Sequence, residues 1–570
     1  MHSLAVLARV GAGAILQRYE SYRADFQALT ARARRRFETR DWQGGQRDAA
    51  ERLALYRAAV AGVERELGEL LGDQLRFESV WRWMKRLFAE FIEQFPDSEL
   101  AATFFNSVTR RVFNTIGIDP ELEFVNLDLR REHYGASSTV HRHHTRTGST
   151  LTLVRAALAP HAFDAPWPER ADDLEWAARR IDAAWPVEFG TLEGLDLLAT
   201  VFYRGSGAYL VGRLRGREKQ LPLVFVLLHG ERGLELDALL TSEREVSVLF
   251  SFTRAHFFVA VERPSEVLVF LHSLMPRKPL PELYIALGHS KHGKTEMYQE
   301  LVGHLNHSMG QFDLSRGQPG MVMIVFDLRS YEYVFKLIRD RFGAPKKNDR
   351  AHVLDRYRLV FEHDRAGRLI EAQEFDHLTF ERRRFTPRLL EELASEASGS
   401  VTIDDELVHL HHVYVERRVQ PLDLYLREAP PEAAARAVID WGQAIRDLAA
   451  TNIFPGDFLL KNFGVTRNGR VTFYDYDEIT RVTECVFLDL PTPRDDGEEL
   501  SAEPWFFVGE HDVFPEEFKN FLGLQGELRA LFLAHHGELT TAAWWRALQE
   551  RLRAGEVLDV LPYTSSRRAA

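Results

Sequence analysis

The residues best suited to chemistry lie between Phe454 and Glu478. Asp457 and Asn462 stand five positions apart, which is the D-x-x-x-x-N spacing of a protein kinase catalytic loop. In that loop the aspartate orients the substrate hydroxyl and the asparagine holds a metal ion. Asp475 follows thirteen positions after Asn462, in the place of the DFG aspartate. The spacing therefore predicts phosphoryl transfer assisted by a divalent metal ion.

The segment between the two expected metal ligands, VTRNGRVTF, predicts a hairpin, with Asn468 and Gly469 supplying a type I′ turn. A hairpin returns the chain beside its start, so Asp475 can meet Asn462 at one magnesium site. Two features depart from protein kinases: no His-Arg pair precedes Asp457, and DYD replaces DFG. An acidic loop around a surface hairpin is the alternative, but it explains the charges without explaining the spacing.

A kinase also needs a strand lysine that grips the α- and β-phosphates and a glycine-containing turn that lies over them. MVMIVFDL and YVFKLI read as adjacent strands, and Lys336 lies within the second, where a charge is costly unless paired. A lysine that extends its ammonium group to solvent is the alternative. Gly317 and Gly320 of SRGQPGM allow close approach to phosphate, although this is no GxGxxG. The candidate partners for Lys336, between which spacing does not choose, are Glu362, Glu371 and Glu374.

The stretch VYVERRVQPLDLYL predicts the strand and linker between two kinase lobes. Adenine usually takes its hydrogen bonds from the backbone of such a linker. We therefore expect the backbone from Glu416 to Arg418 to contact the base.

A second motif, GHSKHGKT from Gly288 to Thr295, satisfies the P-loop pattern GxxxxGK[ST]. It follows ELYIAL, which reads as a strand, and precedes the helical pattern TEMYQELVGHL. No convincing apolar strand ending in an acidic residue follows, as a P-loop NTPase requires for its magnesium. We interpret the motif as a structural strand-turn-helix, with a P-loop NTPase as the alternative.

The pattern of the remaining sequence predicts an α+β protein. Its 570 residues predict two large modules, since single hydrophobic cores stop growing at roughly 250–300 residues. Ala12–Asp73 has the apolar spacing of amphipathic helices, and residues 195–274 contain β-rich runs. The proline-rich MPRKPLPE marks a boundary near residue 280. This predicts a mostly helical first domain, 1–280, and a catalytic domain, 281–570.

Composition narrows the function classes further. A net charge of -12 argues against a general nucleic-acid binder, and we interpret the basic run ARARRRFETR as a solvated helix face. No stretch approaches the roughly 18 apolar residues of a membrane span. A single cysteine, Cys485, fits a reducing cytoplasm. Zinc binding is the less favoured interpretation of two histidine clusters. They are His141 with His143 and His144, and His409 with His411 and His412.

Taken together, several motifs resemble the isocitrate dehydrogenase kinase/phosphatase family. They are GHSKHGKTE, RGQPGMVMIVF, YVFKLIRDRF, EHDRAGRLIEAQEF, NIFPGDFLLKNFGVTRNGR and FYDYDEI, and SEREVSVLFSFTR extends the likeness into the first module. The resemblance implies a regulatory N-terminal domain and a bilobal protein kinase-like domain. It also implies one site that phosphorylates a serine of isocitrate dehydrogenase with ATP and removes the same phosphate, dividing carbon between the citric acid cycle and the glyoxylate bypass.

The resemblance assigns roles residue by residue. The ATP lysine falls on Lys336, the catalytic aspartate on Asp457, and a further acidic position on Glu371, where relatives have aspartate. It implies ATP, with ADP for the phosphatase direction, and Mg²⁺ or Mn²⁺, together with adenine nucleotides and other metabolites as regulators. The GKT motif recurs in the family, which supports the structural interpretation. The expected ATP loop comprises Ser315, Arg316, Gly317, Gln318, Pro319, Gly320 and Met321.

Asp477 and Glu478 are carboxylates that an ordinary kinase lacks at this place. Hydrolysis of phosphoserine needs an oriented water, which a carboxylate beside the metal can provide. If the backbone stays extended, Asp475 and Asp477 point to the same side. We therefore expect Asp477 to serve the phosphatase reaction, with a structural cap as the alternative. A one-way kinase of another substrate and a pseudokinase scaffold are the other function classes, and a pseudokinase would have lost the lysine or a metal ligand.

Overall fold

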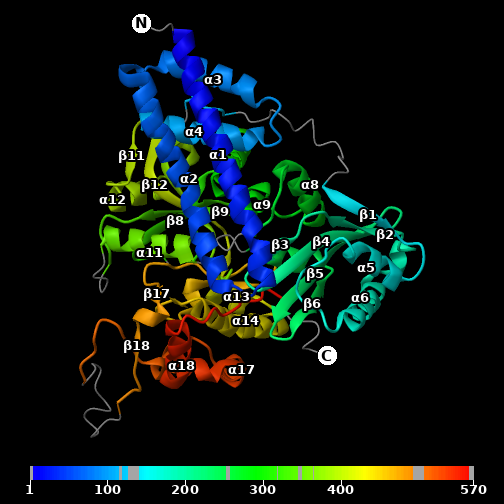
Figure 1. The fold of residues 1–570 in the computed structure, drawn as a ribbon. Coiled ribbons are helices and arrows are strands. Elements are labelled where there is room, and N and C mark those ends of the chain that lie inside the picture. The colour runs from blue at the N-terminus through cyan, green and yellow to red at the C-terminus, as the bar shows by residue number, and fades with distance from the viewer. Residues whose placement is uncertain are drawn as a thin grey trace. The chain divides into compact units, whose positions relative to one another are not determined.

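In the computed structural model the chain forms two compact units, residues 1–307 with 561–570, and residues 308–560 (Figure 1). The structure describes residues 4–114, 119–125, 140–251, 257–317, 319–343, 349–363, 365–491 and 506–563, without the side chains of residues 362 and 363. The division follows His307, whereas the sequence suggests residue 280. Residues 280–307 form two helices, α9 (Leu280–Ala286) and α10 (Ser290–His307), which pack on each other within the first unit.

Four helices open the first unit: α1 (Leu4–Glu38), α2 (Trp42–Leu71), α3 (Glu78–Ile92) and α4 (Ser98–Phe113). The apolar spacing of Ala12–Asp73 predicts the first two. Their apolar stripes form one core in which Trp81 and Phe105 are fully buried. Among the described residues, no helix combines the length and apolar composition that crossing a membrane requires.

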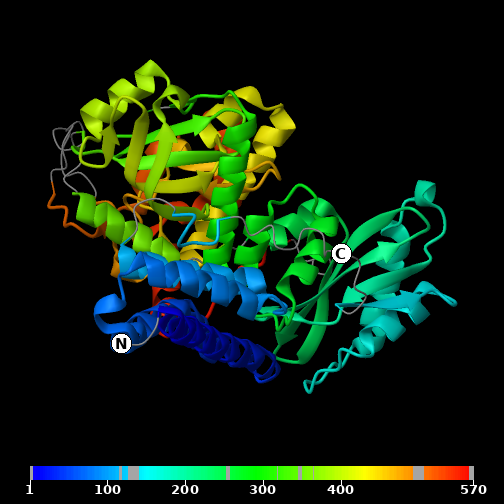
Figure 2. The same cartoon turned by 90° about the horizontal axis from the view of Figure 1, so that it is seen from above.

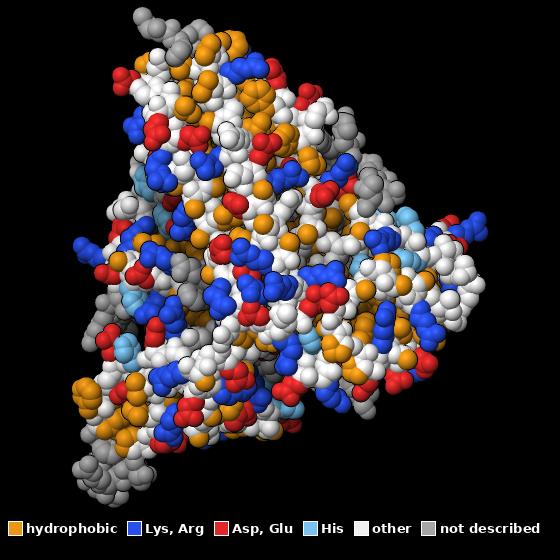
Figure 3. All heavy atoms as spheres, in the orientation of Figure 1, with side chains coloured by type: hydrophobic (Ala, Val, Ile, Leu, Met, Phe, Trp, Pro, Cys, Tyr) orange, Lys and Arg blue, Asp and Glu red, His pale blue; other side chains and the backbone are white. Residues whose placement is uncertain are grey.

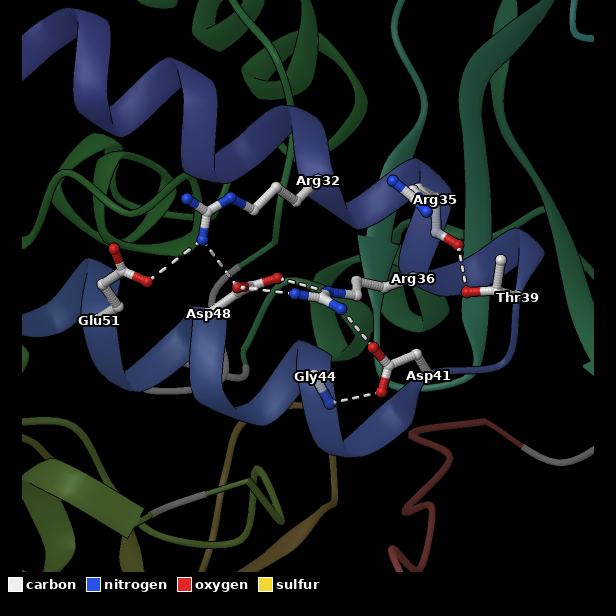
Figure 4. A network of polar contacts seen from close by, with 8 residues as sticks. All are labelled: Arg32, Arg35, Arg36, Thr39, Asp41, Gly44, Asp48 and Glu51. Atoms are coloured by element: carbon white, nitrogen blue, oxygen red, sulfur yellow. Dashed lines mark hydrogen bonds and ion pairs between the residues drawn. The ribbon is translucent and has the colours of Figure 1, made fainter.

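The basic run at the end of α1 forms ion pairs with α2 and is not merely a solvated face (Figure 4). Arg36 lies 2.8 Å from the buried Asp48 of α2, and Arg32 lies 3.2 Å from both Asp48 and Glu51. Asp41 caps α2 by accepting the Gly44 amide at 2.8 Å. Acidic and basic side chains are accordingly mixed over the face that α1 and α2 form in the space-filling view (Figure 3).

A mainly antiparallel sheet completes the first unit, with strand order β1-β2-β4-β5-β6 and β3 paired to β4. Neighbouring residues of β4 and β5 point into two different cores, as the period of two in a strand requires. Tyr209 and Val211 face the core shared with α1–α4, whereas Leu210 faces α5 (Thr150–Leu158) and α6 (Arg170–Ala184). The strands are β1 (His141–Thr145), β2 (Gly194–Leu198), β3 (Phe202–Arg204), β4 (Gly207–Arg215), β5 (Gln220–Gly230) and β6 (Gly233–Leu240).

The β-rich expectation for residues 195–274 therefore holds only to Leu240. Beyond it lie α7 (Glu243–Leu249) and α8 (Pro264–Leu274), and α8 starts at a proline, whose fixed φ suits the first turn of a helix. Short apolar runs do not distinguish a buried helix from a strand, and burial on several sides decides here for helices. The ELYIAL strand prediction is wrong for the same reason, since this run lies in α9.

The second unit begins with a sheet in the order β10-β12-β9-β8-β7, with β11 paired to β12. The two predicted strands around Lys336 are confirmed as the antiparallel neighbours β8 and β9. The strands are β7 (Phe312–Leu314), β8 (Met323–Leu328), β9 (Tyr333–Ile338), β10 (Ala372–Glu381), β11 (Val401–Ile403) and β12 (Leu407–Arg417), and the helices of this part are α11 (Arg350–His363) and α12 (Pro387–Glu396).

A mostly helical part follows, joined to the sheet by the linker after β12 (Figure 2). Its core surrounds Trp441 of α14, and two short hairpin strands, β15 and β16, carry the catalytic sequence. A sheet lobe followed by a helical lobe is the bilobal arrangement expected from the sequence. The helices are α13 (Leu422–Glu428), α14 (Pro431–Ala450), α16 (Phe518–Phe521), α17 (Gly526–His536) and α18 (Ala542–Arg553), and the short strands are β13 (Gln420–Pro421), β14 (Ile453–Phe454), β15 (Phe463–Val465), β16 (Val471–Phe473), β17 (Thr480–Arg481), β18 (Val486–Phe487) and β19 (Asp512–Val513).

Candidate active site

The catalytic loop is held open by a glycine. Gly456 has φ +85°, and a Cβ there would lie 2.9 Å from the Cβ of Glu478, so only glycine fits before Asp457. The Asn462 amide donates to Asp457 Oδ1 at 2.5 Å, which fixes the two side chains relative to each other. The other amide atom, Asn462 Oδ1, is buried and accepts no hydrogen bond from any described residue. Such an oxygen is a ready ligand for a hard cation.

The hairpin after Asn462 returns the chain as the sequence predicts. The Tyr474 amide donates to the Asn462 carbonyl at 3.1 Å, so Asp475 follows directly beside the loop. The predicted type I′ turn is wrong, because Gly469 has φ +72° but Asn468 does not have a positive φ. The Gly469 amide donates to the Thr466 carbonyl and the Thr466 amide to the Arg470 carbonyl, which is a longer loop ending in a left-handed glycine.

Lys336 lies in β9 with its ammonium group among polar atoms of both lobes. It is 2.6 Å from Glu416 Oε2 and donates to the Tyr474 carbonyl at 2.7 Å. The prediction that Lys336 pairs with Glu371 or Glu374 is therefore wrong. The third candidate, Glu362, has a side chain outside the described residues. Glu374 instead pairs with His412 at 2.8 Å.

Strand pairing explains this partner. Lys336 is opposite Tyr414 in β12, and Glu416 is two residues further on the same face. Glu416 is 1% exposed and also accepts from the Tyr357 hydroxyl of α11 at 3.3 Å. Burial raises the pKa of Glu416, and the neighbouring Lys336 charge offsets part of that rise. Sequence reasoning gave Glu416 only a backbone role, because nothing local indicates that β9 and β12 are neighbours.

The expected ATP loop joins β7 to β8. The Ser315 hydroxyl donates to Asp327 at 2.6 Å, and the Arg339 guanidinium donates to the Gly320 carbonyl at 3.0 Å, so both ends of the loop are anchored. Gly317 has φ +122°, a conformation that favours glycine. Arg316 is exposed with Glu428 3.5 Å away, Pro319 and Met321 complete the described part, and Gln318 lies outside the described residues.

The linker after β12 is fixed on both sides. The Arg418 amide donates to the Glu332 carbonyl at 2.8 Å, and Gln420 pairs with Val465 of β15. A Cβ at Gly464 would lie 2.3 Å from Val419 Cγ2, so glycine permits this close packing. The linker therefore passes directly over the hairpin that carries the catalytic residues.

Glu371 enters the site from the segment before β10. Leu369 forms a parallel bridge with Phe473, so the chain two residues further on brings Glu371 level with Asp475. The Gln373 amide donates to the Glu371 carboxylate. Asp477 is buried, and a turn begins there, so the extended backbone assumed from the sequence does not continue to this residue.

The P-loop reading is contradicted by the geometry. α9 precedes the motif in place of a strand, and α10 begins at Ser290, so the Gly293 amide already donates to the His289 carbonyl at 2.9 Å. A Cβ on Gly293 would lie 2.7 Å from the Pro281 carbonyl oxygen. The glycine therefore serves helix packing and not phosphate binding.

The histidine clusters differ in arrangement. Ligand atoms of His141, His143 and Asp196 lie within 4.8 Å of one another. However, Arg213 and Arg215 approach Asp196 at 2.9 Å and 3.5 Å, and these cations already neutralise the carboxylate. In the second cluster His409 contacts Asp404, His411 contacts Thr402 and His412 contacts Glu374, so the three rings engage separate partners. Neither cluster supports a zinc site.

Comparison with known proteins gives matches along almost the whole chain. The profile of the isocitrate dehydrogenase kinase/phosphatase (AceK) regulatory domain matches residues 12–309, and that of the kinase domain matches residues 310–565. An isocitrate dehydrogenase kinase/phosphatase of Anaeromyxobacter sp. (strain Fw109-5) is 51% identical, covering 99% of this chain and 98% of the relative. Proteins with the same name from Anaeromyxobacter dehalogenans and Xanthomonas euvesicatoria are 48% and 43% identical, covering 99% and 98% of this chain and 98% and 97% of those relatives.

Proposed function

Because the chain belongs to the isocitrate dehydrogenase kinase/phosphatase family, we propose that it phosphorylates a serine of isocitrate dehydrogenase with ATP and removes the same phosphate. The observation that carries the proposal is that hydrogen bonds connect four positions in one site. Asn462 bonds to Asp457, and Tyr474, next to Asp475, bonds to both Asn462 and Lys336. A one-way kinase would need no acidic excess after Asp475, and a pseudokinase would lack part of this set. The proposed consequence is control of flux between the citric acid cycle and the glyoxylate bypass.

In the forward direction, Asp457 orients the serine hydroxyl and accepts its proton as the serine oxygen bonds to the γ-phosphorus of ATP. The bond from that phosphorus to the bridging oxygen breaks, and ADP leaves. Lys336 binds the α- and β-phosphates, held in place by Glu416 and the Tyr474 carbonyl. Asn462 Oδ1 and the Asp475 carboxylate would hold Mg²⁺ or Mn²⁺, which neutralises phosphate charge when bound. The buried, unengaged amide oxygen beside a carboxylate fits such an ion.

In the reverse direction, a water oxygen bonds to the phosphoserine phosphorus, the bond to the serine oxygen breaks, and serine and inorganic phosphate result. The water must be oriented against a charged phosphate, and a carboxylate near the metal site can do this. Two carboxylates beyond the expected metal ligands are candidates: Glu371, which follows the Leu369 bridge to Phe473, and Asp477, which follows Asp475 by two residues. We assign them to hydrolysis, with ADP bound in the nucleotide site.

The nucleotide is proposed to lie under Ser315–Met321, with adenine against the linker backbone near Glu416 and Arg418. Support comes from the anchored loop ends and from the linker position over the hairpin. Adenine nucleotides and other metabolites are proposed as regulators acting through the first unit.

The decisive experiment uses purified protein with isocitrate dehydrogenase and magnesium ATP, followed by removal of ATP and addition of ADP. We expect phosphate to enter the substrate in the first step and to leave as inorganic phosphate in the second. Entry without release identifies a one-way kinase, and absence of both contradicts the proposal.

A further inference from the structure

Residues 366–371 belong by sequence between α11 and β10 of the sheet lobe, yet they pack in the helical lobe. Ala366 and Leu369 are buried in a core that joins both lobes and includes Trp441 of α14 and Phe473 of β16. Backbone hydrogen bonds place the segment on the helical side. The Phe473 amide donates to the Arg368 carbonyl at 2.7 Å, and the Ile370 amide donates to the Phe473 carbonyl at 3.2 Å. This segment therefore forms a parallel bridge beside β16 at Leu369, and it carries Glu371 at its end.

The side chain of Arg368 ties this segment to two other elements. It is 3% exposed and forms a bidentate pair with Asp440 of α14, at 2.8 Å and 2.9 Å. It also donates to Asp447 of α14 at 2.7 Å and to the Val471 carbonyl of β16 at 2.9 Å. Asp440 in turn accepts the Val471 amide at 2.6 Å, so one ion pair joins the segment, the helix and the catalytic hairpin.

Charge and burial reinforce the contact. Burial alone would raise the pKa of Asp440, but the charge and hydrogen bonds of Arg368 lower it below its ordinary value. Burial would likewise lower the pKa of Arg368, and Asp447 and Asp440 raise it instead. Both groups are therefore ionised in the folded protein, and their hydrogen bonds are charge-assisted.

The contact has a specific task because the segment pairs with β16 through a single isolated bridge, Leu369 to Phe473, and not through a continuous ladder. A slip of one residue would turn Glu371 to the other face of the segment. The planar fork of arginine matches Asp440 in only one position along the strand. From this geometry we infer that Arg368 is a positioning residue that sets the register of residues 366–371 against β16 and thereby holds Glu371 beside Asp475.

The inference deepens the proposed function, and it rests on that function only where it concerns dephosphorylation. Its main readout is the Mn²⁺ concentration that half-saturates binding of a fluorescent ATP analogue, which requires no isocitrate dehydrogenase. A protein that binds the analogue with Mn²⁺ but leaves isocitrate dehydrogenase unmodified would contradict the proposed function while the positioning role stays testable.

The test compares Arg368→Lys, Glu371→Gln and the double variant with wild type. Lysine keeps the charge but loses the fork, so Glu371 would no longer be held beside the expected ligand Asp475. We expect the Mn²⁺ requirement to rise roughly 10- to 100-fold, as when an outer-shell partner of a metal ligand is lost. In the Glu371→Gln background the same change should add less than about twofold, because Arg368 acts through Glu371. The dephosphorylation rate should show the same non-additivity.

Arg446→Lys is the matched control, since Arg446 also anchors α14 but bonds to Glu538 and to the His535 carbonyl, away from residues 366–371. It should leave the Mn²⁺ requirement unchanged. Equal effects of Arg368→Lys in both backgrounds, or a lowered melting temperature with an unchanged Mn²⁺ requirement, overturn the inference. If Arg368→Lys does not fold, Asp440→Asn, which keeps an acceptor for Val471, takes its place in the same cycle with the same two outcomes.

Discussion

Two regions of this chain contain the residue types of a phosphate site, and they differ in what their polar groups are doing. In Gly288–Thr295 the motif runs into a helix from Ser290 onward, and the Gly293 amide is already bonded to His289. In the stretch from Gly456 to Asp477 a loop and the short β15–β16 hairpin replace a helix, and the buried Asn462 Oδ1 has no protein partner among the described residues. A motif can bind phosphate or metal only where its donors and acceptors are not already hydrogen-bonded within the protein.

The two regions also use glycine differently. Gly456 has a positive φ and permits a sharp bend before Asp457, whereas Gly293 sits inside a helix and allows α9 and α10 to approach closely. Gly456 therefore serves the conformation of the catalytic loop, and Gly293 serves the packing of two helices. The following changes test this contrast from the largest expected effect to the smallest.

Asp457→Ala should reduce phosphoryl transfer roughly 10²- to 10⁴-fold, because the orienting and proton-accepting group is lost. Nucleotide binding should persist, since Asp457 does not contact the expected phosphate positions. Steady-state rates with isocitrate dehydrogenase, together with ATP-analogue binding, measure both. Lost binding with normal residual turnover contradicts the assigned role.

Lys336→Met should lower kcat/KM for ATP in phosphorylation, and the ADP-supported rate of dephosphorylation, by about 10- to 100-fold each. A charge-assisted phosphate contact contributes roughly 1.5–3 kcal/mol. Lys294→Ala is the matched control and should leave the KM for ATP unchanged. An equal loss of ATP affinity in the two variants would revive the P-loop interpretation of Gly288–Thr295.

Asp477→Ala should lower dephosphorylation by about 10²-fold while phosphorylation changes little, because only hydrolysis needs an oriented water. Both rates are measured on one preparation. Equal losses in the two directions would show that Asp477 only supports the loop structure.

Gly293→Ala should destabilise the protein by about 1–3 kcal/mol, because the added methyl group meets the Pro281 carbonyl at 2.7 Å and Ile285 Cγ1 at 2.6 Å. Thermal unfolding reports the loss, and the KM for ATP should stay unchanged below the transition. Gly303→Ala, where a Cβ meets nothing within 4 Å, is the matched helix control.

The stability of the first unit should fall on acidification through His292. This side chain is 2% exposed, and burial lowers its pKa from 6.5 to about 3. Its stabilising contribution is complete above pH 6.5 and declines as pH falls towards 3, because only the unfolded chain takes up the proton in that range. Between pH 7.5 and 5.5 the loss is about 1.4 kcal/mol. Denaturant unfolding at the two pH values should show a smaller loss for His292→Gln, and equal losses contradict the assignment.

How far the sequence predicts the molecule depends on the range of the interactions. The amphipathic helices up to Asp73, strands β8 and β9, and the hairpin between Asn462 and Asp475 follow from local periodicity and turn residues, and the structure contains them. The runs ELYIAL and PSEVLVFL are too short for periodicity to identify, and their packing makes them helices.

By itself, then, the sequence determined the spacing of Asp457, Asn462 and Asp475, because a loop and a short hairpin are local structures whose geometry depends on neighbouring residues. Only the tertiary structure decided that Lys336 pairs with Glu416 and that Arg368 joins Asp440. These partners are 80 and 72 residues apart in sequence. Contacts of that range depend on which strands and helices become neighbours, and this follows from burial of the whole core and from no local pattern.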